Sequence, residues 1–148
     1  MLKKTLFQHC LDNLNNNLVL YEKRKLEIIA ALESESKSSA GDKHETGRAM
    51  VQLEREKLGE QIKATEKDLN ILIPLENHKT SKKAGLGSLV KTDQLNYYIA
   101  ISTPAVNLDN TDYYCISTQS PIGSLILGKK AGDTISFNGK TSTIIEIL

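Results

Sequence analysis

Apolar residues in the first half of the chain recur at alternating steps of three and four, the spacing of one helix face in a coiled coil. One stripe runs from Phe7 to Leu32 and a second from Leu58 to Leu72. No proline occurs before Pro74, so neither helix is interrupted by a missing backbone donor. The pattern predicts two long helices. The stripe positions are Phe7, Leu11, Leu14, Leu18, Tyr21, Ile28 and Leu32 in the first, and Leu58, Ile62, Thr65, Leu69 and Leu72 in the second.

Between the stripes, residues 33–47 carry serines, glycines and mixed charges that interrupt both. Two helices of similar length joined by one short break pack antiparallel. We therefore expect a helical hairpin over residues 1–75 with its tip at about 36–47. A second helix over residues 43–73 would be roughly 45 Å long, so the tip lies far from the hairpin base.

The second half, from Pro74 onward, contains all three prolines and six of the nine glycines. We expect a linker at 76–86 and a small, mostly antiparallel sheet domain at 87–148, which makes the fold α+β. The Asn138-Gly139 pair predicts a two-residue hairpin turn, because both central positions of a type I′ turn need positive φ. The expected strands are Gly87–Thr92, Tyr97–Ser102, Asp112–Ser117, Thr134–Phe137 and Thr141–Ile147.

One short helix interrupts the strands. Ser120 is a good N-cap, Pro121 suits the first helical position, and Gly128 ends the segment. The apolar run within it exceeds what one face of a short helix needs for packing. The apolar side chains of this run that stay exposed would suit contact with a protein partner. The run consists of Ile122, Leu125, Ile126 and Leu127.

The composition of the chain excludes several classes of function. The net charge is +1, with 19 basic and 18 acidic residues, which argues against binding naked nucleic acid by phosphate neutralisation. No apolar run reaches the roughly 18–20 residues of a membrane span, and the N-terminal segment does not resemble a signal peptide, so we expect a cytoplasmic protein. Cys10 and Cys115 are expected to be reduced, buried thiols. The three histidines are scattered without metal-ligand spacing, and we expect no self-contained enzyme.

The hairpin tip carries the cluster Gly41-Asp42-Lys43-His44-Glu45. Asp42 is a favourable N-cap, and Glu45 three residues later forms a pattern close to a capping box. The alternative is that the two carboxylates deliver negative charge into a recessed site of a partner. Spacing alone favours capping and leaves both interpretations open.

Taken together, the tip cluster and the segment Ser120–Asp133 (SPIGSLILGKKAGD) resemble the Gre family of bacterial transcript cleavage factors, GreA and GreB. The resemblance covers nearly the whole chain in the same order. It implies an FKBP-like C-terminal domain that docks on RNA polymerase beside the secondary channel, while the hairpin enters the channel. The partner-binding residues it implies are Ser120, Pro121, Ile122, Gly123 and Leu125.

The resemblance also implies roles at the tip. Asp42 and Glu45 match the two acids that help to hold a catalytic Mg²⁺ at the polymerase active site, where the polymerase cuts the 3′ end of backtracked RNA. Lys43, His44 and Arg48 are candidates for contact with the RNA. The chain needs no cofactor of its own, because the Mg²⁺ is shared with the polymerase. Two carboxylates cannot alone satisfy a cation that takes about six oxygen ligands.

The chain departs from the family pattern after Glu45, where residues 46–49 are Thr-Gly-Arg-Ala instead of Asn-Ala-Glu-Tyr. A non-cleaving regulator that occupies the secondary channel, or a coiled-coil adaptor, therefore remains the alternative to a cleavage factor. The expected partners are RNA polymerase and the nascent RNA 3′ end within it. We expect no membrane contact and a monomeric chain. Prolyl isomerase activity is not expected, because the aromatic residues of the second half offer little for a prolyl pocket.

Overall fold

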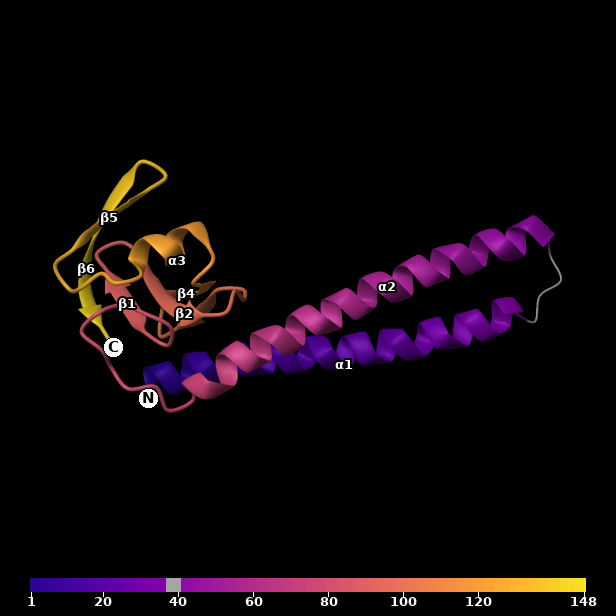
Figure 1. Ribbon diagram of the computed structural model, residues 1–148. Coiled ribbons are helices and arrows are strands. Elements are labelled where there is room, and N and C mark those ends of the chain that lie inside the picture. Colours follow the sequence, from indigo (N-terminus) through magenta and orange to yellow (C-terminus); the bar gives the residue numbers. More distant parts are fainter. Residues whose placement is uncertain (37–40) are drawn as a thin grey trace. The chain divides into compact units, whose positions relative to one another are not determined.

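The computed structural model describes the backbone of residues 1–36 and 41–148, and the side chains of residues 1–34 and 47–148. Its first two elements are the long helices α1 (Leu2–Ser36) and α2 (Gly41–Leu72), which form a helical hairpin (Figure 1). The hairpin confirms the expectation from the stripes. Helix α2 begins two residues before the expected start, so part of the expected tip has helical backbone. A single turn of 3₁₀ helix (Ile73–Leu75) follows.

The hairpin unit, residues 14–68, is held by the seam that the stripes predict. Leu14 and Ile28 of α1 are buried, as are Leu58 and Thr65 of α2. Thr65 is polar, but its hydroxyl donates to the Gln61 carbonyl at 2.9 Å, so burial leaves no donor unsatisfied. Outside the seam, the guanidinium of Arg24 forms an ion pair across the hairpin with Glu54.

The second unit, residues 1–13 and 69–148, is built on a six-stranded sheet of order β3-β4-β2-β1-β6-β5. All neighbours pair antiparallel except β2 and β4, which are parallel. The sheet is therefore mostly antiparallel, as expected. Its strands are β1 (Leu89–Thr92), β2 (Asn96–Ala100), β3 (Val106–Leu108), β4 (Thr111–Ser117), β5 (Thr134–Phe137) and β6 (Lys140–Ile147).

Two tight turns join antiparallel strands. Asn138 and Gly139 have φ of 52° and 76° and connect the paired residues of β5 and β6, which confirms the predicted hairpin. The second hairpin was not expected from the sequence. Asp109 and Asn110 have φ of 51° and 63° and connect β3 to β4 in the same way.

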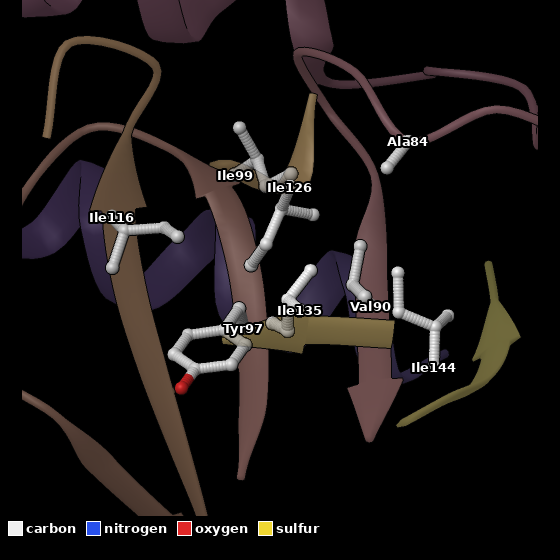
Figure 2. Packing of buried hydrophobic residues seen from close by; sticks show 8 residues of the cluster. All are labelled: Ala84, Val90, Tyr97, Ile99, Ile116, Ile126, Ile135 and Ile144. Carbon is white, nitrogen blue, oxygen red and sulfur yellow. The ribbon is translucent and has the colours of Figure 1, made fainter. Parts of the chain in front are cut away.

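One face of the sheet packs against the short helix α3 (Pro121–Ile126). Figure 2 shows how side chains from different strands converge on Ile126 of this helix. Ile126, Ile99 and Val90 are completely buried. The cluster consists of Ala84, Val90, Tyr97, Ile99, Ile116, Ile126, Ile135 and Ile144.

The first turns of α1 belong to the same unit as the sheet. Leu6 and Cys10 are completely buried there, and the His9 ring lies 3.0 Å from the Pro104 carbonyl. Lys3 lies 3.1 Å from the His78 ring nitrogen. The hairpin base and the sheet thus share one compact unit. Within the described chain, no helix is both long and apolar enough to cross a bilayer.

Candidate functional site

The turn that opens α3 is fixed by Ser120. Its hydroxyl accepts a hydrogen bond from the Gly123 N–H at 3.1 Å and donates one to the Ser117 carbonyl at 2.7 Å. Pro121 occupies the first helical turn, where its missing N–H costs nothing. The Ser-Pro pair therefore caps the helix as predicted, and both polar functions of the Ser120 hydroxyl are used inside the fold.

Gly123 is required by a close backbone approach. A Cβ at this position would lie 2.1 Å from the Ser117 carbonyl oxygen and 2.8 Å from the Ser120 hydroxyl oxygen. No side chain fits without moving the turn. Gly123 is buried, so it shapes the site and offers no side chain to a partner.

Beside this turn, a cavity of about 450 Å³ opens between α3 and the sheet. Its size lies within the range typical of ligand and side-chain pockets. We call it the aromatic cavity, because three of its lining residues are aromatic. The apolar lining residues are Leu95, Tyr97, Tyr114, Ile116, Ile122 and Phe137.

The two tyrosines of the aromatic cavity form a tilted pair, with ring centroids 6.2 Å apart and an interplanar angle of 43°. Burial, with a smaller contribution from Tyr114, raises the pKa of Tyr97. Burial thus favours the uncharged phenol of Tyr97. Three strands bring the aromatic residues of the cavity together. The expectation about prolyl isomerase activity stays a prediction.

The predicted partner-binding residues differ in accessibility. Pro121 is exposed, and Leu125 is 41% exposed. Ile122 is half-buried and lines the aromatic cavity. Leu127, outside that predicted set, is 40% exposed. Pro121, Leu125 and Leu127 thus leave apolar side chains accessible to a partner.

The side chains of Asp42, Lys43, His44 and Glu45 lie outside the described residues, although all four belong to the first turns of α2. Arg48, the third candidate for RNA contact, is exposed. Among the residues that the structure describes, no group of three or more His, Cys, Asp or Glu side chains could hold a metal ion. The metal-binding and capping roles of the tip acids stay predictions.

The two cysteines lie together, although they are 105 positions apart in the sequence. Both are buried and unoxidised, as expected. The Cys10 thiol donates to the Cys115 sulfur, which lowers the pKa of Cys115 to about 7 and raises that of Cys10. The Thr103 hydroxyl, 3.9 Å from the Cys10 sulfur, acts against the rise in the pKa of Cys10. The pair joins α1 to β4 within the sheet unit.

Sequence reasoning missed the cavity residues outside the helix motif. Tyr97 and Tyr114 come from the parallel strands β2 and β4, and Phe137 from β5 at the sheet edge. The aromatic and β-branched alternation marked these segments as strands but could not show which strands pair. The Asn138-Gly139 turn was the available clue, since it places Phe137 at a hairpin end.

No family model matches the chain. No curated protein matches it either. Among solved structures, the chain is similar to the crystal structure of GreA factor homolog 1 (Gfh1) of Thermus thermophilus, with 22% sequence identity and a TM-score of 0.37. The similarity covers 96% of this chain and 94% of that chain.

Proposed function

We propose that this chain is an accessory factor of RNA polymerase that acts as GreA and GreB do. The sheet unit docks on the polymerase, and the hairpin enters the secondary channel and stimulates cleavage of backtracked RNA. One observation carries the proposal. The motifs at residues 41–45 and 120–133 occur in one chain, in the family order, the first where α2 begins and the second around α3. The polymerase supplies the catalysis, so the chain is not itself an enzyme.

The local geometry of α3 supports the docking step. Ser120 and Gly123 fix the turn, and Pro121 and Leu125 are accessible on the same helix. Protein interfaces concentrate their binding energy in a few apolar residues at their centre.

The length and chemistry of the hairpin support the second step. The 32 residues of α2 extend about 48 Å from the acids at one end to Leu72 at the other. Carboxylate oxygens are suitable ligands for Mg²⁺, so Asp42 and Glu45 fit a site whose other ligands come from the polymerase. Bound Mg²⁺ would stabilise the charge that develops on the attacking and leaving oxygens. The two acids would hold it in place near the RNA.

A transcript-cleavage assay on backtracked elongation complexes tests the second step. Asn caps a helix about as well as Asp, so Asp42→Asn removes charge and keeps the cap. Glu45→Gln does the same, because Gln can also complete a capping box. We expect both variants to bind the polymerase normally and to lose most stimulation, with partial rescue at high Mg²⁺. Glu60→Gln, an exposed position in the middle of α2, is the matched control.

The results separate the alternatives. Unchanged stimulation in both variants would mean that the acids only cap the helix. Binding without stimulation by the wild type would support the non-cleaving channel regulator, which the departure at residues 46–49 favours. Absence of binding to the polymerase would leave the coiled-coil adaptor.

Docking is tested separately by a binding titration with RNA polymerase. Leu125→Asp places a charge on the exposed apolar surface without disturbing the core. Loss of a buried interface anchor typically costs about 2 kcal/mol or more, which weakens binding about thirtyfold. Leu86→Asp is the control, since Leu86 is 39% exposed and lies outside the aromatic cavity. Equal affinity of the two variants would place the docking surface elsewhere.

A further inference from the structure

Two stretches of the chain that contain no acidic residue lie side by side in the sheet unit. Residues 77–92 hold four lysines and residues 113–132 hold two, and neither stretch contains Asp or Glu. The backbones of Lys83 and Lys130 form an antiparallel bridge. Next to it, the Ala84 N–H donates to the Lys129 carbonyl at 2.8 Å. The pairing brings two Lys-Lys dipeptides together, although they are separated by more than forty residues.

A groove of about 470 Å³ runs beside this bridge. We call it the lysine groove. Lys82 and Lys130 line it, and both are exposed. Ala131 and Ile145 form part of its wall, and Ile145 is 61% exposed. The groove shares no lining residue with the aromatic cavity, so it is a separate surface of the same unit.

In the part of the chain that the structure describes, neither Lys82 nor Lys130 forms an ion pair. The nearby Asp133 carboxylate is engaged by the Lys130 backbone N–H at 2.8 Å. Glu146 is the one acid of the lining. Two exposed lysines against one glutamate give the lining itself a net positive charge.

The composition of the groove favours an acidic protein segment over a nucleic acid. Single-stranded nucleic acids are held by aromatic side chains on which bases stack, and no described residue that lines the groove is aromatic. The lining instead combines the exposed apolar side chain of Ile145 with the charged side chains of Lys82 and Lys130. Protein interfaces likewise combine apolar side chains with polar ones.

We propose that the lysine groove binds an acidic segment of a partner protein, with an aliphatic side chain of that segment seated against Ile145. Charge complementarity brings the acidic segment to Lys82 and Lys130, and burial of the aliphatic side chain holds it. The proposal does not depend on the partner proposed above. It assigns a second docking surface to the sheet unit.

Fluorescence anisotropy with the full chain tests the proposal. The probe is a short fluorescein-labelled peptide of Asp and Glu that carries a central Leu-Leu pair. We expect a dissociation constant on the order of 100 µM at low salt, weakening as ionic strength rises. The double variant Lys82→Glu/Lys130→Glu should bind at least about tenfold more weakly, because attraction becomes repulsion. Ile145→Ser should weaken binding about threefold or more and keep the salt dependence.

The matched control is Lys57→Glu/Lys63→Glu, which makes the same charge change at two exposed positions on α2. Its affinity should stay within about twofold of wild type. Equal losses in the two double variants would refute the groove as the site, because net charge alone would explain them. Tighter binding of a single-stranded oligonucleotide of equal charge than of the peptide would overturn the choice of partner. Absence of peptide binding up to millimolar concentration would refute the proposal.

Discussion

Replacement of Gly123 by Ala should destabilise the sheet unit strongly, although it adds a single methyl group. The new Cβ would lie 2.1 Å from the Ser117 carbonyl oxygen, far closer than van der Waals contact allows. Two hydrogen bonds hold the turn in place. The Ser117 carbonyl accepts one from the Ser120 hydroxyl, and the Ser120 hydroxyl accepts one from the Gly123 N–H. Relief of the clash must therefore break the cap of α3.

The magnitude follows from these contacts. Loss of the Ser120 cap costs about 1 kcal/mol, and loss of its hydrogen bond to Ser117 about 1 kcal/mol more. Overpacking strain adds about 1–3 kcal/mol. The better helix propensity of Ala returns about 1 kcal/mol. The net expected loss is about 2–4 kcal/mol in the free energy of unfolding of the sheet unit, and each kcal/mol lowers its Tm by about 4–8 °C.

Urea denaturation followed by near-UV circular dichroism is the suitable assay, since four of the five tyrosines lie in the second half of the chain. Gly85→Ala is the control, because no atom lies within 4 Å of a Cβ there and the backbone has ordinary φ. In a Ser120→Ala background, Gly123→Ala should cost less, because the cap is already lost. If Gly123→Ala lowered the free energy of unfolding by no more than Gly85→Ala does, the proposed clash with Ser117 would be refuted.

Three further outcomes are expected. Gly59→Ala, in α2 with no atom within 4 Å of the added Cβ, should stabilise the hairpin by about 0.5–1 kcal/mol in helical circular dichroism melts; a lower Tm would contradict this. Burial and then the charge of Lys3 lower the pKa of His78, so the unfolded chain binds the proton more readily. The free energy of unfolding should therefore fall as the pH drops below about 6.5. In measurements of Tm against pH, the His78→Phe variant should show a smaller fall. Parallel curves for the variant and the wild type would refute the role of His78. Iodoacetamide should label Cys10 and Cys115 about a hundredfold more slowly in the native chain than in urea, because both are buried, and equal rates would contradict their burial.

Local patterns predicted most of the secondary structure. The hairpin seam followed from apolar spacing, and the Ser120 cap and Asn138-Gly139 turn followed from residue chemistry at single positions. The short strand β3 escaped notice because Val106 and Leu108 are its only apolar residues. Its turn, Asp109-Asn110, was still a usable signal, since Asp and Asn tolerate positive φ better than other side chains.

Non-local arrangement was not predictable from the pattern. The parallel pairing of β2 with β4 depends on the chain between them, which places β3 at the sheet edge. That pairing brings Tyr97 beside Tyr114 and creates the wall of the aromatic cavity. The contact of Cys10 with Cys115 likewise needs α1 to pack on the sheet. Both contacts depend on which elements pack against each other. The spacing of apolar residues, every two in a strand or every 3.6 in a helix, shows which face is buried but not which element covers it.

The residues of the SPIG segment separate into two physical classes, and this separation gives the family resemblance a test. Ser120 and Gly123 are used by the fold, because the hydroxyl caps the helix and the absent Cβ permits the close approach. Pro121 and Leu125 are exposed, and nothing in the turn requires a leucine at position 125. A resemblance that reflects the turn alone would make Ser120 and Gly123 matter for stability and none of the four residues specifically for binding. A shared docking surface instead requires Leu125→Asp to weaken polymerase binding at unchanged stability. The same assays applied to Gly123→Ala should show both losses together.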